Sequence, residues 1–131
     1  MSASLNQIAL VVSNYDEAIK YYTNVLDFEL LEDTKMSAIK RWVVVSPKGK
    51  HSCRLLLAKA DSEEQEKSIG NQTGGRVFLF LYTDNFEEQY QNLIKHQVKI
   101  IRGPIDEPYG RVLVFEDFYG NLWDLISQTN L

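Results

Sequence analysis

The chain has 131 residues, 44% of them hydrophobic and 24% charged, and a net charge of −4 at pH 7. This length favours a single domain with a hydrophobic core of its own. The acidic balance, with Lys and Arg scattered along the chain, argues against nucleic acid or an acidic membrane surface as a partner. The single cysteine, Cys53, excludes a disulfide framework and a thiolate metal site, and its place before LLLAKA predicts a buried thiol.

The first half of the chain predicts a strand, a helix and three further strands. Residues 5–12 (LNQIALVV) have the composition of a buried strand, and residues 14–26 carry apolar side chains at helical spacing. Asn14 is the expected N-cap of this helix, with Glu17 three residues later. Further strands are expected at about 28–34, 38–46 and 53–58. The first residues contain no basic segment followed by a membrane-spanning apolar run, which predicts a cytoplasmic protein.

The second half repeats this order. A strand at 76–83 precedes a helix within DNFEEQYQNLIKHQ, for which Asn85 is the expected N-cap with Glu88 three residues later. Strands follow at about 98–102, 111–116 and 122–127. The two caps lie 71 positions apart, as do the aromatic residues Tyr15 and Phe86 that follow them, and this shared offset indicates an internal repeat.

These patterns predict one domain over residues 1–131, of the α+β class. It contains one βαβββ module at about 1–60, a polar linker at about 61–75 and a second module at about 76–131. A short helix is expected within the linker, at Glu63–Ser68. Two such modules can pair into a curved, incompletely closed eight-stranded sheet.

Three segments carry a resemblance to the vicinal oxygen chelate superfamily, which includes glyoxalase I, bleomycin-resistance proteins and extradiol dioxygenases. They are QIALVVSNYDEAIKYYTNVLDFELLED, GGRVFLFLYTDNFEEQYQNLIKH and EPYGRVLVFEDFYGNLWDLI. The resemblance implies a glyoxalase-like fold covering nearly the whole chain. It also implies a homodimer with a small-molecule ligand as its partner.

Metal-using members of that superfamily place four ligands on inward-facing strand positions. By motif alignment these positions hold Gln7, Arg54, Phe78 and Asp124. Gln7 and Asp124 could coordinate a metal, whereas Phe78 has no donor atom and the cation of Arg54 repels a divalent ion. The resemblance therefore predicts that the metal site is lost and that no cofactor is bound. His51 and His96 are expected to be solvated and do not restore a ligand set.

The same four positions can serve another purpose. Asp124, set among apolar strand residues, needs a partner, and the repeat offers Arg54, 70 positions earlier. This pair is either a structural ion pair or part of a ligand site. Strand alternation adds Phe80 to Gln7 and Phe78 as lining of a mostly apolar cavity, although Phe78 and Phe80 could equally fill it.

Two further segments offer candidate pocket residues. In the predicted loop 102–111 (RGPIDEPYGR), Tyr109 and Arg111 lie near the cavity mouth if the resemblance holds, and Arg111 could hold an anionic group. The alternative is a proline-ordered turn with a surface arginine. Trp42 is a third candidate wall residue whose facing direction the sequence leaves open.

The leading hypothesis is a metal-free small-molecule-binding protein of the bleomycin-resistance type, acting by sequestration. A second hypothesis is a metal-dependent lyase, isomerase or dioxygenase of the glyoxalase type. A third is a metal-independent enzyme that uses Arg54, Tyr109 or Arg111 to stabilise an anionic intermediate. The sequence leaves open whether the protein is an enzyme.

Overall fold

The computed structural model describes residues 1–129. The chain divides into two compact units, unit 1 at Met1–Lys67 and unit 2 beginning at Ser68. The boundary falls inside helix α2 (Glu63–Ser68), which begins and ends at the predicted residues. Among the described residues, no helix is long and apolar enough to cross a membrane.

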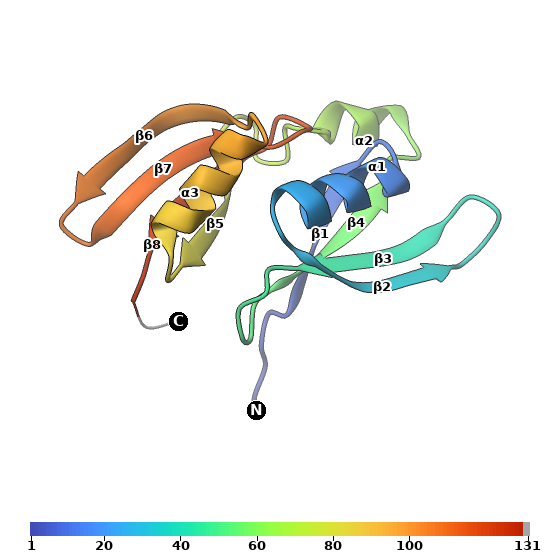
Figure 1. Cartoon of the computed structure of the whole chain (residues 1–131). Coiled ribbons are helices and arrows are strands. Elements are labelled where there is room, and N and C mark those ends of the chain that lie inside the picture. Colours follow the sequence, from blue (N-terminus) through green and yellow to red (C-terminus); the bar gives the residue numbers. More distant parts are fainter. Residues whose placement is uncertain (130–131) are drawn as a thin grey trace. The chain divides into compact units, whose positions relative to one another are not determined.

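Unit 1 contains one strand, a helix and three further strands (Figure 1). The elements are β1 (Gln7–Val12), α1 (Tyr15–Lys20), η1 (Tyr21–Val25), β2 (Glu29–Lys35), β3 (Arg41–Ser46) and β4 (Arg54–Lys59). The strands form a mixed sheet in the order β1-β4-β3-β2, in which only β1 and β4 are parallel. The predicted helix is confirmed, and its second half, η1, is a wider π-helical turn.

Unit 2 repeats this arrangement. The elements are β5 (Val77–Thr83), α3 (Phe86–Lys95), β6 (Lys99–Glu107), β7 (Gly110–Glu116) and β8 (Leu122–Ser127). They form a second four-stranded sheet in the order β5-β8-β7-β6, again with one parallel pair. The predicted α+β class and the two βαβββ modules are therefore confirmed.

The predicted helix caps are also present in both units. The side chain of Asn14 accepts a hydrogen bond from the Glu17 amide at 2.9 Å, and Asn85 accepts one from the Glu88 amide at 3.2 Å. Asn85 also donates to the carboxylate of Glu88 at 2.8 Å, which completes a reciprocal cap. Each cap satisfies an amide that the first turn of a helix leaves without a partner.

The core of each unit lies between its helix and one face of its sheet. In unit 1, β1, β3 and β4 bury alternate aliphatic residues on this face: Leu10, Val12, Val43, Val45, Leu55 and Leu57. In unit 2 the corresponding residues of β7 and β8 are Leu113, Phe115, Trp123 and Leu125. We call the opposite face of each sheet its helix-free face. Strand alternation places Gln7, Arg54, Phe80 and Asp124 there.

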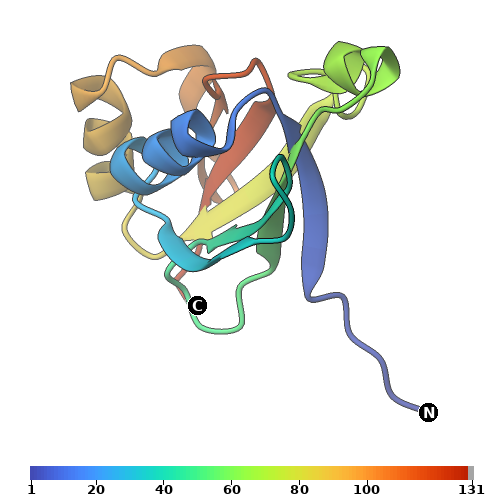
Figure 2. The ribbon, with the colours of Figure 1, turned by 90° about the vertical axis from the view of Figure 1, so that its right-hand side faces the viewer.

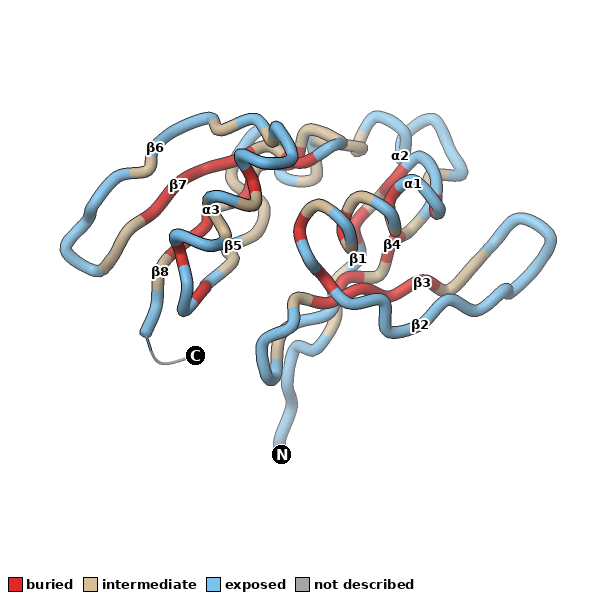
Figure 3. Tube along the Cα trace, in the orientation of Figure 1, coloured by how far each residue is buried: buried red, intermediate tan, exposed pale blue. Residues whose placement is uncertain are grey.

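Exposure is concentrated at the sheet edges and at the N-terminus. The edge strand β2 is exposed along its whole length, and β6 along most of its length (Figure 3). Residues 1–6 run on from the start of β1 as an exposed segment (Figure 2). The more central strands β3 and β7 contain buried runs, so each hydrophobic core is built on the middle of its sheet.

Two local predictions were wrong. The segment 102–111 is not a loop, because β6 extends to Glu107 and β7 begins at Gly110, so the two strands form a hairpin. Pro104 is accommodated because β6 is an edge strand whose pairing shifts register between Arg102 and Ile105. Cys53 is exposed rather than buried, since it lies in the connection before β4 and not in the strand.

Candidate functional site

The motif DFYGNLWDLI forms the turn between β7 and β8, and its buried acid is Asp117. The carboxylate of Asp117, which is only 4% exposed, accepts hydrogen bonds from the amides of Tyr119 and Asn121 at 3.0 Å. It also accepts from the Asn121 side chain and from the Trp123 indole, each at 3.0 Å. Gly70 packs on this turn, where a Cβ atom would collide with the carbonyl oxygen of Tyr119. This part of the motif is therefore structural.

Asp124 lies on the helix-free face of unit 2 in a row of paired residues. It pairs with Phe80 on one side and Val114 on the other, and Val114 pairs with Arg102. Its Oδ1 atom is buried and has no hydrogen-bond partner within residues 1–129. Burial raises the pKa of Asp124, and the positive charge of Arg102 opposes that rise in pKa. The nearby cation within the sheet is thus Arg102, which the sequence analysis missed.

The strand register does not support the assignment of Arg54 as the repeat counterpart of Asp124. In unit 1, Arg54 pairs with Gln7 and Leu56 pairs with Ala9. In unit 2, Asp124 pairs with Phe80, because the pairing shifts register between Val77 and Leu79. Since Ala9 and Phe80 are 71 positions apart, the register makes Leu56 the counterpart of Asp124.

The residues at the family's metal positions do not fit a metal. Phe78 and Arg54 supply no ligand atom, and Gln7 and Asp124 alone fall short of the three protein ligands of a catalytic site. Within residues 1–129, no group of three His, Cys, Asp or Glu side chains could hold a metal ion. Phe78 instead lines a cavity of about 200 Å³ in unit 2, beside the buried Asn121.

Two other predicted pocket residues lie at or near the tip of the β6–β7 hairpin. Tyr109 is 69% exposed at the tip. Arg111 contacts the start of α3: its guanidinium lies 3.2 Å from the Glu87 carboxylate and 5.6 Å from the Phe86 ring centroid. It also forms an ion pair with Asp106 at 3.6 Å. Arg111 therefore fastens the hairpin to the helix on the helix side of the sheet.

Two cavities of unit 1 open where β3 and β4 separate. These strands pair only from Val43 to Val45, whereas β2 and β3 stay paired as far as Lys35 and Arg41. The hairpin tip at 36–40 therefore diverges from the end of β4, and two adjoining cavities of about 450 and 670 Å³ lie between them. We call this space the hairpin groove. Five residues line both cavities: Tyr15, Ser37, Ile39, Arg41 and Lys59.

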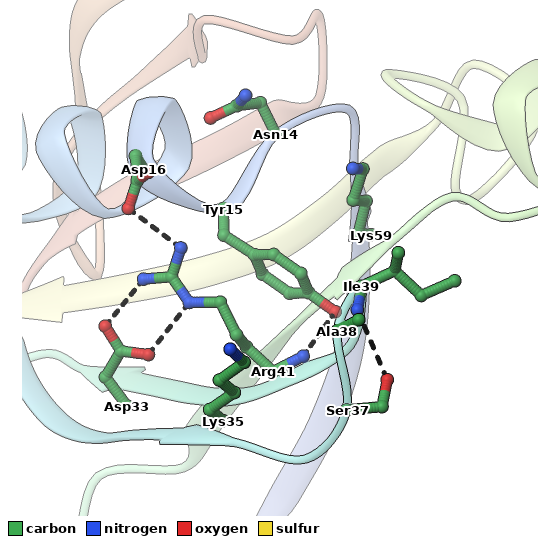
Figure 4. Close-up of a pocket in the computed structure, with 10 residues that line it drawn as sticks. All are labelled: Asn14, Tyr15, Asp16, Asp33, Lys35, Ser37, Ala38, Ile39, Arg41 and Lys59. Carbon is green, nitrogen blue, oxygen red and sulfur yellow. Dashed lines mark hydrogen bonds and ion pairs between the residues drawn. The ribbon is translucent and has the colours of Figure 1, made fainter.

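Arg41 holds the hairpin groove in shape. Its guanidinium donates two hydrogen bonds to Asp33, at 2.6 and 3.0 Å, and one to Asp16 at 2.9 Å (Figure 4). The hydrogen bond to Asp33 raises the pKa of Arg41 and lowers the pKa of Asp33, so both groups stay charged. The guanidinium also lies 5.2 Å from the ring centroid of Tyr15. Because its donors are used in this way, Arg41 is a structural residue of the groove.

Trp42 is the predicted wall residue that the structure places in the hairpin groove. It is half-buried and lines the larger cavity together with Leu56 and Ala58 of β4. Tyr15, Ser37 and Lys59 were missed, because their positions depend on where β3 leaves β4. The sequence did contain one signal that pointed to Arg41. Arg41 and Arg111 are 70 positions apart and therefore occupy equivalent positions of the repeat.

Comparison with known proteins agrees with this architecture. Residues 4–125 match the family described as Glyoxalase/Bleomycin resistance protein/Dioxygenase superfamily. The chain therefore belongs to this superfamily, which confirms the resemblance seen in the sequence. An uncharacterized protein of Shewanella frigidimarina (strain NCIMB 400) is 54% identical over 128 residues, covering 97% of this chain and 95% of that protein.

Two solved structures show the same fold. UcmS2 is 28% identical with a TM-score of 0.81, over 96% of this chain and 98% of that one. TnmS3, an antibiotic binding protein from Streptomyces sp. CB03234, is 26% identical with a TM-score of 0.74, over 96% of each chain.

Proposed function

We propose that the protein binds a small organic molecule without a metal and acts by sequestering it, with the hairpin groove of unit 1 as the binding site. The observation that carries this proposal is the larger cavity of about 670 Å³, which combines the apolar side chains of Trp42, Leu56 and Ala58 with polar and charged side chains. Small-molecule sites in proteins have this size and combine apolar walls with polar groups that orient the ligand.

Two further observations support a binding role. Neither a histidine nor a cysteine is among the described residues that line the groove, and the two acids of the smaller cavity, Asp16 and Asp33, are held by Arg41. TnmS3, which has the same fold, is an antibiotic binding protein. Binding through Gln7, Arg54, Phe78, Phe80, Tyr109, Arg111 or Asp124 stays a prediction, as do the homodimer and the cytoplasmic location.

Trp42 provides the test. In buffer with EDTA, we expect the neutral fluorescent probe N-phenyl-1-naphthylamine to bind saturably at one site and to quench tryptophan fluorescence. Trp42→Ala removes the groove wall and should weaken probe binding about tenfold or more, since it removes a large apolar contact. Leu30→Ala, which removes an exposed apolar side chain of β2 outside the groove lining, is the matched control. Unchanged binding by Trp42→Ala, or no binding by any chain, would contradict the proposal.

A further inference from the structure

Two hydroxyl groups in the hairpin groove have protons that no described residue accepts. The Tyr15 hydroxyl accepts a hydrogen bond from the Arg41 amide at 3.2 Å, and the Ser37 hydroxyl accepts from the amides of Ile39 and Lys40 at 3.3 and 3.1 Å. A hydroxyl has one proton to donate in addition to its lone pairs. Because backbone amides already donate to both oxygens, one amide to Tyr15 and two to Ser37, the remaining proton of each hydroxyl can be donated to a ligand.

Tyr15 is the more constrained of the two. The residue is only 8% exposed, and its ring lies between the start of α1 and the β2–β3 hairpin, with the hydroxyl directed at the hairpin (Figure 4). The amide of Arg41 and the guanidinium above the ring fix it in place. Because Tyr15 lines both cavities and is held in one position, its hydroxyl proton is available to a ligand acceptor at little cost in conformational entropy.

The charges around the smaller cavity add to this preference. Lys35 and Lys59 line it, and neither forms an ion pair with any residue in the described part of the chain. The acids that line it, Asp16 and Asp33, are both engaged by Arg41. With Arg41 counted, three cations face two anions in a chain whose net charge is −4. This cavity is thus locally cationic on an acidic protein.

We propose that the hairpin groove takes an organic acid, with its carboxylate or similar oxyanion at Tyr15 and Ser37 and its apolar body against Trp42 and Leu56. This inference rests on the proposed function and names the ligand class. The two hydroxyls donate to the oxyanion, and Lys35 and Lys59 supply the opposite charge. An organic cation would instead face two ammonium groups and two hydroxyl donors.

A pair of fluorescent probes tests the charge preference separately from binding itself. 8-Anilinonaphthalene-1-sulfonate carries an oxyanion on the same aromatic body as the neutral N-phenyl-1-naphthylamine. We expect the sulfonate to bind about tenfold tighter than the neutral probe, as a charge-assisted hydrogen bond allows. Tyr15→Phe should remove most of this difference, so that the ratio of the two affinities falls toward one; the neutral probe, measured on the same variant, corrects for any change in the shape of the groove. A cooperative urea transition shows that the variant is folded.

The lysines are tested with a matched control. Lys35→Gln and Lys59→Gln together should weaken sulfonate binding about fivefold and reduce its salt dependence. Lys20→Gln and Lys50→Gln together make the same change of charge at two exposed positions outside the groove lining, and should leave binding unchanged. Equal affinities of the two probes, or equal losses in this control and in the Lys35 and Lys59 double variant, would overturn the oxyanion site while leaving small-molecule binding intact. Failure of both probes to bind would overturn the proposed function as well.

Discussion

Units 1 and 2 share a detailed arrangement of side chains and differ in a few atoms. In each unit an arginine at the start of the third strand, Arg41 or Arg111, lies over an aromatic ring at the start of the helix. In each it pairs with the acid that follows this ring and with an acid on the second strand. The ring belongs to Tyr15 in unit 1 and to Phe86 in unit 2, so only unit 1 has a hydroxyl there.

The backbone amide of this arginine donates to a different hydroxyl in each unit. The amide of Arg41 donates to the Tyr15 hydroxyl, whereas the amide of Arg111 donates to the side chain of Ser127 on β8 at 2.7 Å. In unit 2, β7 and β8 pair from Val112 to Glu116, but in unit 1 the corresponding pairing covers only Val43–Val45. In both units, therefore, an arginine joins the hairpin to the helix, and we call this arrangement, made by Arg41 or Arg111, the arginine clasp. In unit 1 a shorter strand pairing also opens the hairpin groove.

The largest expected effect concerns the turns that close the two sheets. The turn of unit 2 surrounds the buried carboxylate of Asp117, whereas in unit 1 the connection between β3 and β4 is mostly exposed. Asp117→Ala should lower the free energy of unfolding by roughly 2–4 kcal/mol, because several buried donors lose their acceptor. Urea denaturation measures this change.

The control for Asp117 is an exposed ion pair of unit 1. Lys48→Ala removes the ion pair with Asp27, at 2.7 Å on the surface of unit 1, and should change the free energy of unfolding by less than about 1 kcal/mol. A loss for Asp117→Ala no larger than that for Lys48→Ala would show that the turn does not stabilise unit 2.

The sequence predicted the elements because the repeat, the helix caps and the apolar periodicity are all local signals. It predicted Trp42 as a wall residue but not the groove, since the groove depends on where β3 separates from β4. It paired Asp124 with Arg54 by counting positions, and the register shift in β5 made that count misleading. Arg102 could have been found only by knowing which residue of β6 shares a row with Asp124.

The arginine clasps formed by Arg41 and Arg111 should contribute differently to stability. Arg41 makes shorter ion pairs than Arg111, and its side chain is less exposed, at 27% against 42%. Arg41→Ala should therefore cost about 1–2 kcal/mol of unfolding free energy, and Arg111→Ala about half as much. Urea denaturation of the two variants, at the same ionic strength, measures the difference. Equal losses of unfolding free energy would mean that the shorter and less exposed ion pairs of Arg41 stabilise the protein no more than those of Arg111.

The smallest effects concern two acids whose pKa values shift in opposite directions, Asp33 in unit 1 and Asp124 in unit 2. The hydrogen bond from Arg41 lowers the pKa of Asp33, so Asp33 stabilises the fold above its unfolded pKa and loses this contribution as pH falls. Burial raises the pKa of Asp124, so its favourable contribution exists in acid and is lost as pH rises through the folded pKa.

Replacement by asparagine should therefore have opposite consequences at neutral pH. Asp33→Asn should lower the free energy of unfolding at pH 7, and Asp124→Asn should raise it, each by less than about 1 kcal/mol because both side chains are partly solvated. Both differences should shrink toward about pH 3, where the unfolded carboxyl groups are also protonated. Urea denaturation at the two pH values measures this. If Asp124→Asn instead destabilised the protein at pH 7, the carboxylate would be stabilised by its surroundings, and Arg102 would outweigh burial.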